Sequence, residues 1–233
     1  MEGWNQKPEA EKEHLRSRCE PFVDATRSTK AQGSDRSRFA SALLTLAAME
    51  ALFSPNGYTE QADLGKTITR LTVVSLLEKL EENREQAASV LPRMTYTVSE
   101  KGKPSWSDKA LPAFNLSHSE EGICVVLSQT EVGVDLQMHK AVETEKIATR
   151  FFAPEEVKMV AAGGLPAFYR IWARKEAYTK MRGISLGEVL PMDLSHIEKQ
   201  NDHIKFSEMT ISIGEQNYSL AVCEAIPDEK VNA

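Results

Sequence analysis

The chain has 233 residues, of which 41% are hydrophobic and 27% are charged, and its formal net charge is −6. This composition predicts a folded protein with a normal buried core, in one large domain or two small ones. The acidic balance argues against general nucleic-acid binding, which depends on a basic surface that neutralises phosphates, so we expect no nucleic-acid partner.

The sequence also argues against a membrane span and against cysteine chemistry. No run approaches the roughly 18 to 20 apolar residues that a span requires, and residues 1–6 lack the build of a signal peptide, so we expect a cytoplasmic protein without a membrane partner. Cys19, Cys124 and Cys223 are isolated and odd in number, which indicates neither a disulfide framework nor a zinc site. Buried or idle thiols are expected.

The first half of the chain is mostly helical in its pattern. Residues 1–20 predict a loose or partly helical tail. Residues 39–53 predict a buried helix with Asp35 as its N-cap. Residues 71–91 repeat apolar side chains at helical spacing and predict a second, amphipathic helix that packs against the protein.

Short strands dominate the rest of the chain and flank one long helix. A turn is expected at residues 101–104, and a hairpin at residues 114–128. The remaining predicted strands are residues 93–99, 132–137, 190–194, 204–206, 209–213 and 218–222. Because strands and helices occur in blocks and do not alternate, the predicted fold class is α+β.

The strand at residues 132–137 carries an acid where burial is expected. Period two puts Asp135 and Gln137 on one face of this strand and the valines and leucine on the other. A buried carboxylate needs a cation or hydrogen-bond donors. The pattern therefore predicts either a metal ion or a paired lysine beside Asp135.

The helix predicted at residues 166–183 carries a carboxylate and an ammonium on one face. Pro166 suits a first turn and Gly183 suits a left-handed C-terminal cap. Residues four apart share a face, so Trp172, Glu176 and Lys180 form one stripe. Taken alone, Glu176 and Lys180 are also consistent with an ordinary surface ion pair.

A basic segment stands out in this acidic chain. Residues 146–182 contain eight cations against three acids, a local charge of +5, which leaves −11 for the rest. Such a segment predicts a site for an anionic ligand or an acidic partner, with a solvated helical face as the alternative.

Four ordered stretches carry a resemblance to a known family. They are Gly102-Lys103-Pro104; Phe114-Asn115-Leu116-Ser117-His118-Ser119; Gly133-Val134-Asp135 with Phe151-Phe152 and Glu155-Glu156; and Trp172-Ala173-Arg174-Lys175-Glu176-Ala177 with Lys180. Together they resemble the 4′-phosphopantetheinyl transferases, in particular the large, pseudodimeric kind that activates surfactin synthetase. The match covers about residues 102–180 and weakens to scattered basic residues before residue 54.

The resemblance implies a fold and a reaction. The fold would be two similar α+β lobes in one chain, residues 1–131 and residues 132–233. The reaction would move 4′-phosphopantetheine from coenzyme A to a serine of an apo carrier protein, acyl, peptidyl or polyketide, and would release 3′,5′-ADP. The protein would act as a monomer and would depend on Mg²⁺.

The resemblance also assigns roles to individual residues. The expected metal ligands are Asp135 and Glu176, with Gln137 as a further ligand, directly or through water. The expected catalytic residues are Glu176, Lys180 and His118. The expected coenzyme A contacts are Arg36, Lys103, Ser117, His118 and Lys180. These types suit the chemistry, because Mg²⁺ prefers oxygen ligands and a cation beside the pyrophosphate stabilises the leaving phosphate.

Gln137 departs from the family pattern, which has a second acid at this position. A glutamine offers a carbonyl oxygen but no charge, so water completes the metal shell or the metal binds more weakly. A non-catalytic coenzyme A or carrier-protein binding module is therefore an alternative, and an interaction protein built around residues 71–91 is a third.

Ser117 and His118 could also suggest a serine–histidine catalytic pair. Neighbours on an extended segment point to opposite faces, however, which argues against this interpretation.

Overall fold

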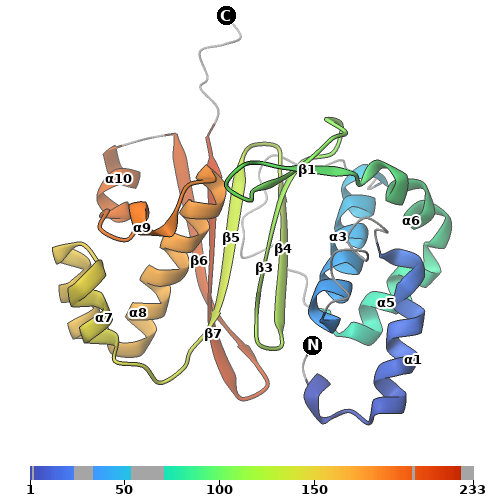
Figure 1. Ribbon diagram of the computed structural model, residues 1–233, viewed down its shortest axis with the longest axis horizontal. Coiled ribbons are helices and arrows are strands. Elements are labelled where there is room, and N and C mark those ends of the chain that lie inside the picture. Colours follow the sequence, from blue (N-terminus) through green and yellow to red (C-terminus); the bar gives the residue numbers. More distant parts are fainter. Residues whose placement is uncertain (2, 24–33, 54–70, 201–202, 227–233) are drawn as a thin grey trace, which may run out of the picture. The chain divides into compact units, whose positions relative to one another are not determined.

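The computed structural model describes residues 1, 3–23, 34–53, 71–200 and 203–226 (Figure 1). It divides into two compact units, which we call unit 1 (Met1–Val98 with Pro104–Ala113) and unit 2 (Ser99–Lys103 with Phe114–Ala233). Helices and antiparallel strands occur in both units, so the predicted α+β class is confirmed. Unit 2 includes residues 114–131, which the sequence prediction assigned to the first lobe.

Unit 1 is mainly helical. Its helices and its small sheet are α1 (Glu9–Cys19), α3 (Asp35–Phe53), α5 (Val73–Glu82), α6 (Arg84–Val90), β1 (Tyr96–Val98) and β2 (Pro104–Trp106). Helix α1 buries Leu15 and Cys19, so the described part of the first 20 residues is packed and partly helical, not a loose tail. The single helix predicted at residues 71–91 is wrong in one respect, because Asn83, with φ −116° and ψ 34°, separates α5 from α6.

Asp35 links the start of α3 to the N-terminal helix. Its two carboxylate oxygens accept hydrogen bonds from Arg16 Nε (2.6 Å) and Nη2 (3.0 Å), and Trp4 Nε1 donates to Oδ2 (3.0 Å). This arrangement fixes the first turn of α3, where the predicted coenzyme A contact Arg36 follows.

The strands of unit 2 form two small sheets. Its strands are β3 (Ala113–Ser119), β4 (Gly122–Ser128), β5 (Val132–Met138), β6 (Ile204–Ile213) and β7 (Gln216–Ala225). Strands β3 and β4 pair with each other, and the second sheet has the order β5-β7-β6, with Asp135 opposite Ala221. The two strands predicted at residues 204–206 and 209–213 are one continuous strand, β6.

Three short polar side chains of β3 form hydrogen bonds with the edge of β5, the strand beside β3 in Figure 1. Each accepts a hydrogen bond from a backbone N–H of β5: Asn115 Oδ1 from Val134 (3.1 Å), Ser117 Oγ from Leu136 (3.2 Å) and Ser119 Oγ from Met138 (3.0 Å). These contacts satisfy backbone donors that the β5-β7-β6 sheet leaves unpaired.

Helix α8 (Pro154–Arg182) packs against β5 and β7 and carries the residues of the predicted helical stripe. It consists of two segments, because Gly164 has φ 59° and ψ −144°, outside the helical region. The second segment matches the prediction: Pro166 lies in its first turn, and Gly183 caps its end with φ 62°. The first segment, at residues 154–163, was not predicted.

The approach of α8 to β5 depends on a glycine. A Cβ atom at Gly133 would lie 2.1 Å from the carbonyl oxygen of Ala177 and 2.4 Å from the nitrogen of Met181. Backbone meets backbone at this point, so no other residue fits without moving the helix.

The strand predicted at residues 190–194 is wrong. Helices α9 (Leu186–Val189) and α10 (Leu194–Gln200) flank that region, and α7 (Thr144–Phe151) precedes α8. Glu188 closes a capping box with Ser185, and Asp193 Oδ1 accepts from the first N–H groups of α10, so local capping favoured helices. Among the described residues, no helix has the length and apolar character needed to cross a membrane.

The expectation of buried thiols is confirmed for two of the three cysteines. All three cysteines are free, and Cys19 and Cys223 are buried. Burial raises the pKa of each thiol to about 12, so the reactive thiolate is scarce at neutral pH.

Candidate active site

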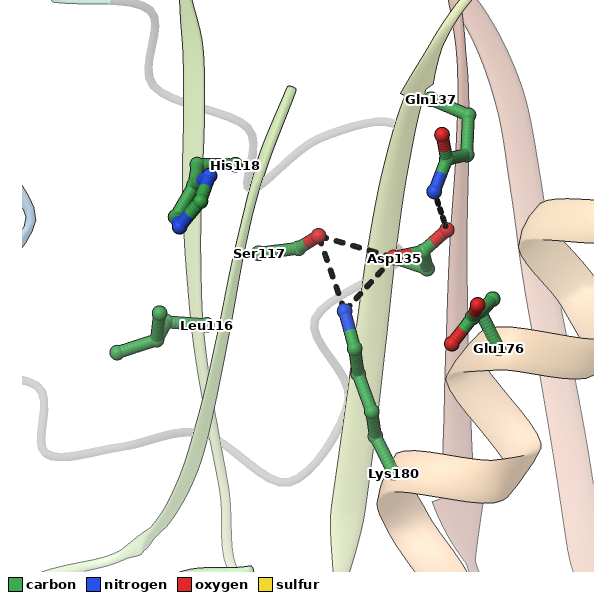
Figure 2. A pocket seen from close by; sticks show the side chains of 7 residues that line it. All are labelled: Leu116, Ser117, His118, Asp135, Gln137, Glu176 and Lys180. Atoms are coloured by element: carbon green, nitrogen blue, oxygen red, sulfur yellow. Dashed lines mark hydrogen bonds and ion pairs between the residues drawn. The ribbon is translucent and has the colours of Figure 1, made fainter. Parts of the chain in front are cut away.

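Strands β3 and β5 and helix α8 of unit 2 line an open pocket of about 360 Å³. Figure 2 shows the seven residues that line it: Leu116, Ser117, His118, Asp135, Gln137, Glu176 and Lys180. Six of them are residues to which the family resemblance assigns a role. Leu116 was not predicted, although period two on residues 114–119 puts it on the same face as His118.

Asp135 is at the centre of the hydrogen-bonded group and is only 1% exposed. Lys180 Nζ lies 2.7 Å from its Oδ1, and Ser117 Oγ donates to the same oxygen at 2.9 Å. Gln137 Nε2 donates to Oδ2 at 3.0 Å, so Asp135 and Gln137 share a face as the alternation predicted. Of the two partners predicted for this buried carboxylate, the structure supplies the lysine.

The ammonium of Lys180 uses all three of its donors within unit 2. Besides Asp135, it donates to Ser117 Oγ (3.0 Å) and to the carbonyl oxygen of Val134 (3.1 Å). An ammonium has three N–H groups and no acceptor, so no donor is left over in this arrangement.

The hydroxyl of Ser117 also has all of its hydrogen-bonding positions occupied. Its hydroxyl donates to Asp135 and accepts from Lys180 and from the N–H of Leu136, which uses its one donor and two acceptor positions. His118 is exposed and points away from Ser117 (Figure 2). No hydrogen bond joins the two among the described residues, in agreement with the argument against a serine–histidine pair.

Glu176 differs from Asp135 because no described residue donates a hydrogen bond to its carboxylate or forms an ion pair with it. Burial, followed by the negative charge of Asp135, raises its pKa above the ordinary 4.5, although Lys180 opposes the shift. The ionised carboxylate is therefore partly desolvated without a hydrogen-bond donor to compensate for the cost. This is expected of a group that binds a ligand from outside the chain.

The donor set fits a hard divalent cation that brings further ligands with it. Two carboxylates and one amide face the same pocket, and Mg²⁺ is usually held by one or two carboxylates together with waters and substrate phosphates. The described residues contain no group of three or more His, Cys, Asp or Glu suited to a metal, so the remaining ligands would come from outside. The atom of Gln137 that meets Asp135 is its nitrogen, so a ligand role for its oxygen stays a prediction.

Two predicted coenzyme A contacts lie outside this pocket. Lys103 Nζ donates to the carbonyl oxygen of Met181 near the end of α8 and pairs with Glu131. Arg36 lies on α3 in unit 1. Their roles in binding coenzyme A stay predictions.

The basic segment at residues 146–182 is not one exposed surface. Lys175 is fully buried and pairs with Glu156 at 2.7 Å. Arg174 pairs with Glu198 and Glu208. The cations that remain at the surface are Lys146, Arg150, Lys158, Arg170 and Arg182.

Sequence comparisons identify the family. Residues 131–225 match the family model of the 4′-phosphopantetheinyl transferase superfamily. The 4′-phosphopantetheinyl transferase AcpT of Salmonella typhimurium (strain LT2) is 36% identical over 154 residues, which cover 61% of this chain and 72% of that protein. AcpT of Escherichia coli (strain K12) is 32% identical over 180 residues, 74% and 84% of the two chains. The 4′-phosphopantetheinyl transferase Sfp of Bacillus subtilis (strain 168) is 29% identical over 146 residues, 57% and 64%.

These matches include the segments that build the pocket. The family model spans β5 and α8, which contribute Asp135, Glu176 and Lys180. The relatives extend the similarity over up to 74% of the chain. The protein is therefore a transferase that belongs to the 4′-phosphopantetheinyl transferase superfamily.

Proposed function

We propose that the protein transfers 4′-phosphopantetheine from coenzyme A to a serine hydroxyl of an apo carrier protein, with Mg²⁺, and releases 3′,5′-ADP. The observation that carries this proposal is the meeting of Asp135, Glu176 and Lys180 in one pocket. Family membership supplies the reaction, and the pocket supplies groups that such a reaction needs.

Asp135 and Glu176 are the proposed ligands of Mg²⁺, with Gln137 contributing directly or through a water. When bound, the ion supplies charge neutralisation at the pyrophosphate. The half-buried carboxylate of Glu176 also accepts the proton of the serine hydroxyl.

The remaining residues bind and orient coenzyme A. Lys180 and His118 donate hydrogen bonds to phosphate oxygens, where preorganised positive charge stabilises the transition state. Ser117 and Lys103 contact the nucleotide side, and Arg36 binds the 3′-phosphate.

The partner is an acyl, peptidyl or polyketide carrier protein, which is commonly acidic. Cations of α7 and α8 such as Lys146 and Arg150 are exposed and suit such a partner. We further propose that the chain is a cytoplasmic monomer of two α+β lobes, with residues 114–131 in the second lobe. Light scattering of the purified protein tests the oligomeric state.

The decisive experiment mixes the protein with coenzyme A, Mg²⁺ and an apo carrier protein and follows the mass of the carrier by mass spectrometry. We expect the carrier to gain the mass of one phosphopantetheine. Glu176→Gln should abolish the gain, whereas Glu155→Gln, an exposed position on the same helix, should not.

Other outcomes identify the alternatives. Coenzyme A binding by calorimetry without any transfer would favour a non-catalytic module, and the absence of coenzyme A binding would favour an interaction protein. Near-normal turnover in Glu176→Gln would overturn the role given to Glu176.

A further inference from the structure

The strongest feature that the reaction leaves unexplained is how completely Lys180 is held. Its three N–H groups meet Asp135 Oδ1, Ser117 Oγ and the Val134 carbonyl at 2.7 to 3.1 Å. A lysine in this state offers no donor to a phosphate. To bind a substrate phosphate it has to give up a contact that it makes here.

Asp135, the proposed metal ligand bonded to Lys180, also has both of its oxygens occupied. Asp135 is 1% exposed, and Lys180 is the cation bonded to it. Of its two oxygens, Oδ1 accepts from two donors and Oδ2 accepts from Gln137. A divalent ion that binds Asp135 together with Glu176 would bring two further positive charges close to this ammonium, and like charges at such short range repel strongly.

We propose that Lys180 is the internal counter-ion of the metal site and that its ammonium competes with the divalent cation for Asp135. Cation binding displaces Lys180 from Asp135 and thereby frees its donors for phosphate oxygens. The cation and the phosphates of the substrate therefore assist each other, because each favours the same displaced position of Lys180.

This inference rests on the proposed function, because the competing ion is the one that the transfer uses. It goes further by giving Lys180 a role before any substrate arrives. A lysine whose only role is to bind phosphate would leave the affinity of the substrate-free protein for Mg²⁺ unchanged.

The first test titrates Mg²⁺ alone into the protein by calorimetry, without coenzyme A. Lys180→Met should bind Mg²⁺ at least about tenfold more tightly than the wild type, since an opposite charge in contact with a carboxylate is worth about one pKa unit or more. Lys140→Met is the matched control: it also removes an ammonium that pairs with an acid, Glu120, but outside the pocket, and should change the affinity less than about twofold.

The second test measures the response of Lys180 in the wild-type protein itself. The side-chain ammonium signal of Lys180, assigned in NMR spectra by its loss in Lys180→Met, should shift or broaden as Mg²⁺ saturates the protein. A signal that stays unchanged at saturation would overturn the proposal, and so would equal affinities in wild type and Lys180→Met or no measurable Mg²⁺ binding in either.

The two proposals can fail separately. Tighter Mg²⁺ binding in Lys180→Met without any phosphopantetheine transfer by the wild type would leave the competition intact and overturn the proposed function. Normal transfer with no change in Mg²⁺ affinity would overturn only the competition.

Discussion

Asp135 and Gln137 form a pair in which an amide donor fixes an acid. Gln137 Nε2 contacts Oδ2, while Lys180 and Ser117 contact Oδ1, so the carboxylate cannot rotate without losing hydrogen bonds. An acid at position 137 could not supply this donor. Compared with an acid at this position, glutamine therefore lacks a negative charge but fixes the orientation of Asp135.

The substitution Gln137→Glu tests how the missing charge and the amide donor affect Mg²⁺ binding and stability. It adds a charge beside the proposed ion and should lower the Mg²⁺ concentration for half-maximal transfer by about three- to tenfold. Two carboxylates in contact repel, so the same variant should melt at a lower temperature in EDTA and regain stability in Mg²⁺. Gln137→Ala should stay close to the wild type in its Mg²⁺ requirement. Loss of all activity in Gln137→Ala would show instead that the amide is an essential ligand or substrate contact.

His139 links stability to pH. It stacks on Tyr169 with ring centroids 5.0 Å apart, its Nε2 lies 2.9 Å from Ser219 Oγ, and burial lowers its pKa below the ordinary 6.5. The unfolded chain therefore takes up a proton at a higher pH than the folded chain does. The free energy of unfolding should be largest above pH 6.5 and should fall as the pH drops through this value towards the lowered pKa.

Urea unfolding at a series of pH values between 5 and 8 measures this dependence. His139→Gln should flatten the slope, and His196→Gln, at an exposed position, should leave it unchanged. An equal slope in the wild type and His139→Gln would show that other groups cause it.

Sequence patterns predicted contacts between individual residues only where the residues are close in sequence. Period two on one strand was enough to put Asp135 and Gln137 on the same face. The partner of Asp135 could be predicted as a lysine or a metal, but the choice of Lys180, 45 positions away, depends on how α8 packs on β5. For the same reason the contact of Lys103 with the carbonyl of Met181, 78 positions away, was not predicted.

At the scale of elements, the approach of α8 to β5 decides where Glu176 and Lys180 lie. Gly133→Ala would place a methyl carbon 2.1 Å from the carbonyl oxygen of Ala177, so the helix has to move outward. We expect a loss of about 1 to 3 kcal/mol in stability, as for other overpacked sites, and a larger loss of transfer rate because Lys180 is displaced. Urea unfolding and transfer assays measure the two effects.

Gly187→Ala is the matched control for this prediction. A Cβ at Gly187 meets only Ser185 Oγ, at 3.8 Å, so stability and rate should change little. If Gly133→Ala were as stable and as active as the wild type, the close approach would not position the site.

The errors in the predicted elements have identifiable causes. Residues 190–194 have apolar side chains at alternate positions like a strand, but the caps formed by Glu188 and Asp193 favour helices on either side. The helix predicted at residues 71–91 kept its apolar period through Asn83, and periodicity does not reveal a change of backbone direction at one residue. In the same way, the pattern of residues 166–183 gave no indication of the helical segment that precedes Gly164.

For the whole molecule, the balance of charge predicts how an acidic carrier associates. The chain carries −6 overall, yet Lys146, Arg150 and Lys158 are exposed on α7 and the start of α8. Raising the salt concentration from low to above physiological should raise the apparent KM for the carrier, because salt screens exposed charges.

Carrier titrations at several salt concentrations test this prediction. Arg150→Gln should reduce the salt dependence, whereas Lys205→Gln, exposed on β6, should retain it. A carrier KM that does not respond to salt would argue against electrostatic steering by these cations.

The three polar side chains of β3 have a consequence for solubility. An edge strand with free backbone donors is a template for pairing with other chains, and β5 is the edge of its sheet. Asn115, Ser117 and Ser119 occupy those donors without forming a backbone ladder. The same residues that help to hold the Asp135 face therefore also leave this edge with fewer free backbone donors for another chain to pair with.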